Sequence, residues 1–168
     1  RAPLSHRVKA TRRPWTMGVV PGSPSRYRAC LLDALGTTVR LEPPWERIDP
    51  ALVDGIPPER VRRAFAAEMT YYGAHAHEAG DPARLAALRE RCAELLTEGL
   101  GRAVTVAALM DSIAFAAYED AAPAMDALRA AGVRIVCVSN WDCELADVLA
   151  RVGLAERFDG VVASALAG

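Results

Sequence analysis

The chain has 168 residues, of which 52% are hydrophobic and 24% charged, and its net charge is −1. This composition is typical of an ordinary soluble globular domain and excludes a disordered or fibrous protein. No stretch reaches the roughly 18 apolar residues of a membrane-spanning helix, because the best candidate, residues 104–118, is interrupted by Asp111 and Ser112. We therefore expect one domain, or two small ones, that is not integral to a membrane.

The cysteines indicate the cellular compartment, and the charge distribution sets the first residues apart from the rest of the chain. The four cysteines lack the spacing of a metal site or a disulfide framework, which indicates a reducing compartment and a cytoplasmic protein. The first 32 residues hold seven basic side chains and no acidic one. A basic arm can bind nucleic acid or target an organelle. Because it contains four prolines and no apolar period, we instead expect residues 1–27 to be a disordered or non-native leader, with the true start at Met17 and no nucleic-acid partner.

The first half of the folded part is predicted to be one strand followed by helices. Residues 28–33 form a short apolar run that ends at Asp33 and precedes Gly36, as expected for a strand buried in a parallel sheet. Prolines and a glycine predict an irregular connection over residues 41–56. Helical spacing and capping signals then predict three helices, at 57–78, 82–99 and 105–118.

The second half alternates between helices and strands. We expect a helix at 122–131, a β-branched strand at 133–138, a helix at 143–152 and a strand at 160–163. This order predicts an α/β fold with a parallel sheet and a helical module inserted after the first strand.

Two polar clusters follow the first two predicted strands. Asp33 ends the first strand, and Gly36 permits a tight turn behind it. Ser139 and Asn140 end the second strand, before a helix that Asp142 can cap. Ligands of open α/β sheets bind at the carboxyl ends of the strands, so the clusters together offer a nucleophile and a cradle for an anion.

These clusters resemble two motifs of the haloacid dehalogenase-like (HAD) hydrolase superfamily. The run LLDALGTTV is similar to its first motif, an apolar strand followed by D-x-x-x-[TV], and IVCVSNWD is similar to its second, a strand that ends in Ser or Thr. Helices lie between them, where that family places a cap. The resemblance implies an incomplete Rossmann-like core of residues 28–42 and 119–168, with a helical cap at 43–118.

The resemblance also implies roles for individual residues. Asp33 would be the nucleophile and form a covalent intermediate that water hydrolyses. Ser139 and Asn140 would bind a phosphoryl or carboxylate group, Thr37 would support the loop, and backbone amides near Gly36 would stabilise negative charge. Magnesium would be held by Asp33 and by the main-chain carbonyl of Leu35. The substrate would be a small molecule.

Two departures from the family pattern leave alternatives open. Leu35 stands where the phosphatase branch has an aspartate that protonates the leaving group. The third and fourth motifs would follow Gly168, so we expect a truncated chain with little turnover, whose exposed strand edge favours a homodimer. We expect a phosphatase for a small phosphorylated metabolite. The alternatives are a 2-haloacid dehalogenase that needs no magnesium and an inactive remnant that only binds.

Other polar residues are weaker candidates. His75 and His77 would point about 200° apart on a helix and cannot share a metal ion. Tyr71 and His75 could face Asp33 from the helical module, although packing explains them as well. Arg40 could meet an anionic substrate, although an exposed arginine is the simpler interpretation.

Overall fold

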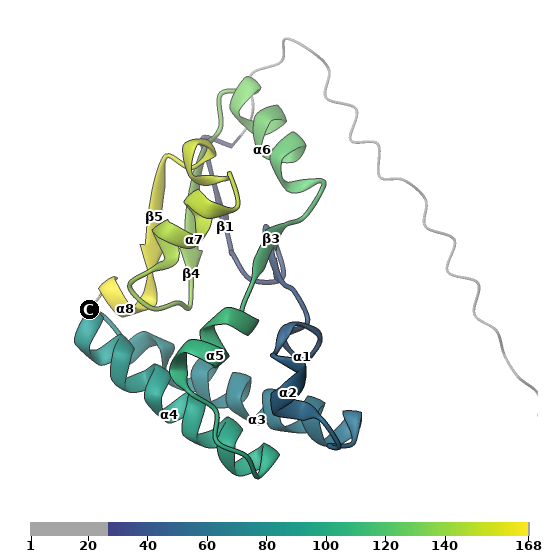
Figure 1. Ribbon diagram of the computed structural model, residues 1–168. Coiled ribbons are helices and arrows are strands. Elements are labelled where there is room, and N and C mark those ends of the chain that lie inside the picture. The colour runs from purple at the N-terminus through teal and green to yellow at the C-terminus, as the bar shows by residue number, and fades with distance from the viewer. Residues whose placement is uncertain (1–26, 168) are drawn as a thin grey trace, which may run out of the picture.

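The computed structural model describes residues 27–167, so nearly all of the predicted leader lies outside the described residues. Three strands form a parallel sheet in the order β1-β4-β5, with β1 at Ala29–Leu32, β4 at Arg134–Ser139 and β5 at Gly160–Ala163. The parallel sheet and the α/β class are therefore confirmed. Figure 1 shows the helices α3 and α4 beyond one end of this sheet.

One face of the sheet is covered by helices. The helices α6 (Ala121–Ala130) and α7 (Leu145–Arg151) pack against Ile135 and Cys137 of β4, whose side chains are fully buried. Successive residues of a strand point to opposite faces, and Arg134 and Val138 on the other face of β4 are exposed. The 3₁₀ turn η2 (Ala155–Arg157) and the short helix α8 (Ser164–Ala167) complete this part of the chain.

The inserted module has a hydrophobic core of its own. Its main helices, α3 (Pro58–His75) and α4 (Pro82–Leu100), pack on each other, and η1 (Ala76–Glu78) links them. Asp81 caps α4, because its side chain accepts hydrogen bonds from the backbone amides of Ala83 and Arg84. The helix begins at Pro82, as the sequence predicts. The short helices α1 (Pro44–Arg47), α2 (Pro50–Val53) and α5 (Val106–Ser112) surround this pair.

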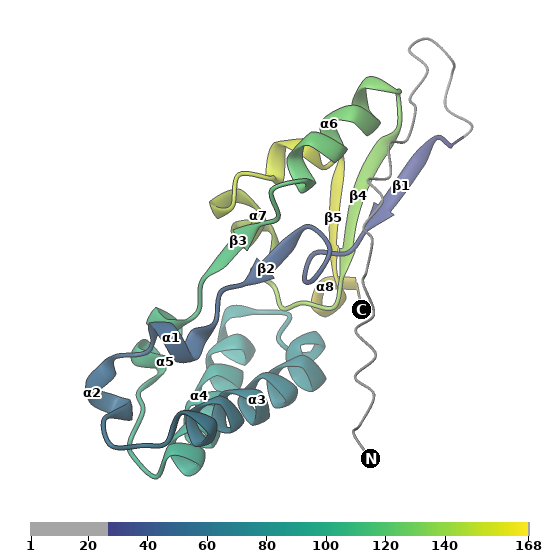
Figure 2. The same ribbon diagram turned by 90° about the vertical axis from the view of Figure 1, so that its right-hand side faces the viewer.

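The predicted helix at 105–118 is wrong in its second half. The helix α5 ends at Ser112, and β3 (Phe115–Ala117) pairs antiparallel with β2 (Val39–Leu41). A three-residue strand exists only through its partner, and the partner lies more than 70 residues away, so local spacing could not reveal it. Figure 2 shows this ribbon between the sheet and the module. No described helix is both long and apolar enough to cross a membrane.

The second face of the sheet carries exposed apolar side chains. Leu31 on β1 is 68% exposed, and the paired residues Val138 and Val162 are exposed as well. Among the described strands β1 pairs only with β4, so its other edge has no strand partner there. Exposed apolar patches and free strand edges favour association.

We predict that the 168-residue chain self-associates through this face. Leu31→Lys should shift the sedimentation equilibrium toward monomer, because a charge on the patch opposes its burial. Leu166→Lys, at an exposed leucine of α8, is the matched control and should not do so. A wild-type chain that stays monomeric at high concentration would contradict the prediction.

Candidate active site

The carboxylate of Asp33 is fixed through one of its two oxygens. The Ser139 hydroxyl donates a hydrogen bond of 2.6 Å to Oδ1 of Asp33, and the Ala34 amide donates to the same oxygen at 2.8 Å. Within residues 27–167, Oδ2 accepts no hydrogen bond. Asp33 is therefore oriented at Oδ1 and has an available lone pair at Oδ2, which is the arrangement that a carboxylate nucleophile needs.

The loop after Asp33 is stabilised by its own backbone. Gly36 adopts a φ of 81°, in the left-handed region that favours glycine, and its amide donates to the carbonyl of Val39 at 2.8 Å. That amide is consequently engaged and does not face a substrate. The loop support expected from Thr37 comes from Thr38, whose buried hydroxyl donates to the Asp33 carbonyl at 3.1 Å, while Thr37 is exposed. The path of the turn brings the side chain of Thr38, and not that of Thr37, back to the end of β1.

Asn140 joins the sheet to the helical module. Its Nδ2 donates to the carbonyl of Gly73 on α3 at 3.0 Å, and its Oδ1 accepts from the Ser164 hydroxyl at 2.7 Å. Both ends of the amide are thus engaged within the protein. Asn140 also lines the cavity at this edge of the sheet, so its expected part in substrate binding stays a prediction beside this linking contact.

A cavity of about 690 Å³ lies between the carboxyl ends of the strands and the helical module. Asp33, Leu35 and Ser139 line it on the side of the sheet, and side chains of α3, α4 and α5 line the other side. Much of its wall is apolar, consisting of Leu35, Leu41, Met69, Leu109, Met110, Ile113, Phe115, Trp141, Val148 and Val152. A largely apolar cavity with a few polar groups is typical of small-molecule sites.

A second contact holds the module over this cavity. The Tyr72 hydroxyl donates to Oδ2 of Asp142 at 2.7 Å, and Oδ1 of Asp142 accepts from the Glu144 amide at 2.7 Å. Asp142 is only 3% exposed, so its two hydrogen bonds compensate the loss of water. Burial, and then the neighbouring Asp142, raise the pKa of Tyr72 well above its ordinary value, so the phenol remains a donor. Glu144 also binds Arg89 of α4 at 2.6 Å.

Glu68 is a buried acid that the sequence analysis missed. It lines the cavity from α3, is 5% exposed, and its Oε2 has no hydrogen-bond partner among the described residues. Burial raises the pKa of Glu68, and a hydrogen bond with Cys92 opposes that effect only in part. The sequence did contain a signal, because Glu68 continues the buried face of α3 formed by Val61, Ala64 and Phe65.

The remaining candidates lie elsewhere. Tyr71 and His75 stack with ring centroids 4.1 Å apart and line a separate hollow with Arg84 and Arg91, so they do not line the cavity of Asp33. Arg40 forms an ion pair with Glu42 at 3.0 Å.

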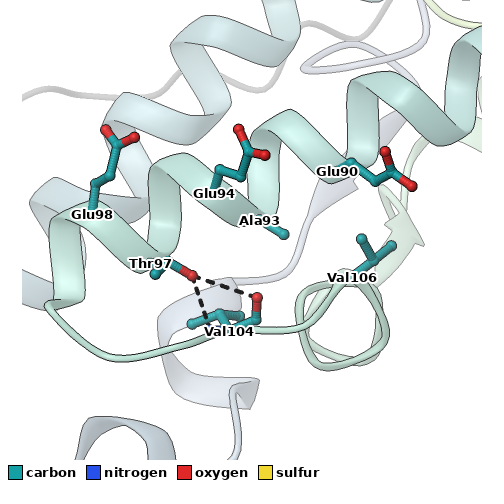
Figure 3. Close-up of a pocket in the computed structure, with 7 residues that line it drawn as sticks. All are labelled: Glu90, Ala93, Glu94, Thr97, Glu98, Val104 and Val106. Atoms are coloured by element: carbon teal, nitrogen blue, oxygen red, sulfur yellow. Dashed lines mark hydrogen bonds between the residues drawn. The ribbon is translucent and has the colours of Figure 1, made fainter.

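Another hollow lies between α4 and the segment that contains Val104 and Val106 (Figure 3), and Glu90, Glu94 and Glu98 are on its rim. Arg91 pairs with two of these glutamates, so the row is a solvated helix face.

The described residues do not by themselves complete a magnesium site. Asp33 and the Leu35 carbonyl were the expected ligands, and Mg²⁺ takes oxygen ligands in octahedral geometry. Within residues 27–167, no group of three or more His, Cys, Asp and Glu side chains is placed to hold a metal ion. No chemical step is therefore assigned to a metal.

We predict that Tyr72→Phe lowers the free energy of unfolding by about 1–3 kcal/mol, because it leaves a buried oxygen of Asp142 without its donor. Tyr71→Phe is the control on the same helix, since its hydroxyl makes no hydrogen bond to a described residue. Urea unfolding of both variants measures the difference. Equal stability of the two variants would contradict the assignment.

A second prediction concerns the pH dependence of stability. Because the pKa of Glu68 is raised in the folded state above its ordinary value of 4.5, its protonated form favours folding, and this contribution is lost as pH rises through the folded pKa. The Glu68→Gln variant has no carboxyl group at this position, so this pH-dependent contribution is absent from its free energy of unfolding. Its free energy of unfolding should therefore increase relative to wild type as pH rises above 4.5, in urea titrations at several pH values. A constant difference between the two proteins would refute it.

Three solved structures with a similar fold are named as dehalogenases. A dehalogenase solved with an intermediate complex has a TM-score of 0.55 and 22% identity, over 82% of this chain and 62% of its own. L-2-haloacid dehalogenase from Xanthobacter autotrophicus has a TM-score of 0.54 and 23% identity, over 82% of this chain and 56% of its own. The same enzyme with chloropropionic acid covalently bound has a TM-score of 0.52 and 21% identity, with the same coverage of 82% and 56%.

These likenesses show the fold, and this chain spans less than two thirds of the length of the structures that it matches. No curated protein matches its sequence. The family model of the haloacid dehalogenase-like hydrolases matches residues 27–168. Since the match extends over most of the chain, the protein belongs to the haloacid dehalogenase-like hydrolase family.

Proposed function

We propose that Asp33 is the nucleophile of a hydrolase that acts on a small organic substrate. The observation that carries this proposal is the asymmetry of its carboxylate, since Ser139 and Ala34 fix Oδ1 while Oδ2 accepts no hydrogen bond from a described residue. Oδ2 attacks the electrophilic atom, the leaving group departs with its bonding electrons, and an aspartyl ester forms. Water then attacks the ester, which releases the product and restores the carboxylate with loss of one proton.

The geometry favours displacement of halide from carbon as the reaction. Leu35 lines the cavity and is 46% exposed, but its side chain cannot donate a proton. A halide ion leaves without protonation, whereas an alkoxide leaving group is helped by a general acid. The apolar cavity wall also suits a haloalkyl group. The dehalogenase that was solved with chloropropionic acid covalently bound adds support from a protein of the same fold.

Hydrolysis of a phosphate monoester is the second candidate. The Ser139 hydroxyl lies within hydrogen-bond distance of Asp33 and suits a phosphoryl oxygen that reaches the same place. This reaction also calls for magnesium, for which Asp33 and the Leu35 carbonyl are the available ligands. Either substrate is a small molecule.

We further propose that residues 43–118 act as a cap on a core of residues 28–42 and 119–168. Two separate hydrophobic clusters support this division. Phe115 and Ala117 of β3 pack against the cluster of the core, so the boundary runs through the ribbon of β2 and β3. The free thiols of all four cysteines, which are all described residues, support the proposal of a cytoplasmic location.

We predict that Asp33→Asn abolishes turnover and leaves the fold intact, because a neutral amide of nearly equal volume is a poor nucleophile. Ser139→Ala should slow turnover by about 10- to 150-fold, the equivalent of one hydrogen bond to a charged group. Halide release from 2-chloropropionate and phosphate release from 4-nitrophenyl phosphate are measured for each variant. Circular dichroism serves as the control for folding.

Mass spectrometry of acid-quenched wild type tests the covalent step. The expected product is an adduct on the peptide that contains Asp33, either an ester formed from the haloacid or an aspartyl phosphate formed from the phosphate monoester. Retained activity of Asp33→Asn, or an adduct on a different residue, would remove Asp33 from the proposal. The substrate that is turned over decides between the two candidate reactions.

A further inference from the structure

We propose that Arg151 binds an anionic group at one end of an elongated, otherwise apolar substrate, whose reacting atom lies at Asp33. This proposal deepens the function above and rests on it only in taking the bound molecule to be the substrate. Both residues line the same cavity, Asp33 from just after β1 and Arg151 from the last turn of α7. The hydrocarbon part of the substrate lies on the apolar wall between them.

The cavity follows one side of α7 along the whole length of the helix. The residues of this helix and its two ends that line the cavity are Glu144, Val148, Arg151 and Val152. Their spacing of i, i+4, i+7 and i+8 places them in one stripe, with the helix backbone behind it, so they reach the cavity with their side chains. The 7 residues of α7 extend over about 10 Å. Arg151 therefore lies well away from the beginning of the helix, which follows Ser139 and the carboxyl end of β4.

The size of the cavity favours a substrate larger than a short haloacid. Its volume is about 690 Å³, whereas 2-chloropropionate fills about 180 Å³ at roughly 30 Å³ for each non-hydrogen atom. With so small a ligand, water would remain against the apolar side chains of the wall that are only partly buried, which are Leu41, Met69, Met110, Ile113, Phe115 and Val152. A longer hydrocarbon group covers these side chains and releases that water.

Arg151 is a cation of the cavity wall without a carboxylate partner. Arg89 also lines the cavity but is paired with Glu144 at 2.6 Å. The Arg151 side chain is exposed and forms no ion pair or hydrogen bond with a described residue. A guanidinium group keeps its charge and binds a carboxylate or a phosphate through two parallel hydrogen bonds. Asp111 lines the cavity from α5 and repels an anion on that wall, so the anionic group is directed to α7.

Unreactive probes test the proposal in the Asp33→Asn variant of the intact chain, where no turnover is expected. Octanoate has an extended chain of similar length to α7 and ends in a carboxylate, and octyl phosphate ends in a phosphate. Propionate lacks the long chain, and 1-octanol lacks the charge. In NMR titrations octanoate should bind at least about 10-fold more tightly than propionate, because its chain covers the apolar wall. It should shift the amide signals of α7 and β3.

The role of the charge is tested by Arg151→Met, which keeps a long apolar side chain. This variant should bind octanoate or octyl phosphate about 3-fold more weakly, as expected for an exposed ion pair, and should bind 1-octanol unchanged. The loss should become smaller at high salt concentration, which screens exposed charges. Arg134→Met is the matched control, because Arg134 is also exposed but does not line the cavity. It should bind all probes as the parent protein does. The anion that is affected more strongly by Arg151→Met identifies the group that Arg151 binds.

Three results would each overturn the role of Arg151. They are equal affinities for octanoate and propionate, affinities for both anions that Arg151→Met leaves unchanged, and signal shifts confined to the exposed sheet face of Leu31, Val138 and Val162. Failure of the nucleophile proposal gives a different pattern. In that case Asp33→Asn stays active in the turnover assays, while the binding of octanoate and its dependence on Arg151 persist.

Discussion

The hydrogen bond between Ser139 and Asp33 depends on the parallel pairing of β1 with β4. Leu32 pairs with Cys137, so both strands run to the same edge of the sheet, where β1 ends at Leu32 and β4 ends two residues after Cys137. In an antiparallel pair the two ends would lie at opposite edges. The register therefore brings together two residues that are 106 positions apart in the chain. A slip of one residue would turn Ser139 to the other face of the sheet and break the contact.

Three acids that line the cavity, two at the edge of the sheet and one on α3, have different surroundings. Oδ1 of Asp33 has two donors, both oxygens of Asp142 have donors, and Glu68 retains an oxygen with none. Hydrogen bonds to a carboxylate stabilise its charge, and burial without them favours the proton. The same functional group thus has three different environments, and its neighbours alone decide which of its oxygens are hydrogen-bonded.

The sequence predicted the parts of the fold that local pattern determines. The apolar runs of β1, β4 and β5 and the capped helix after Asp81 lie within one or two residues of their predicted positions. The pairing of β2 with β3 could not be predicted, since neither strand has a signal apart from its partner. In the site, Asp33 and Ser139 lie at the carboxyl ends of apolar strands, so the sequence could identify them. Thr38 could not be separated from Thr37, because only the path of the turn decides which hydroxyl faces inward.

Glu68 illustrates a different limit of sequence reasoning. A glutamate in a helix is usually exposed. Glu68 is buried because the helical module packs over the end of the sheet, which a sequence pattern does not show. Asp33 belongs to an element of the sheet and Glu68 to a helix that packs in the other hydrophobic cluster. Substitutions on the wall of the module can therefore alter which molecule fits without disturbing the packing that holds Asp33. The links made by Asn140 and Tyr72 restrict that freedom, because they fix this part of α3 relative to the end of β4.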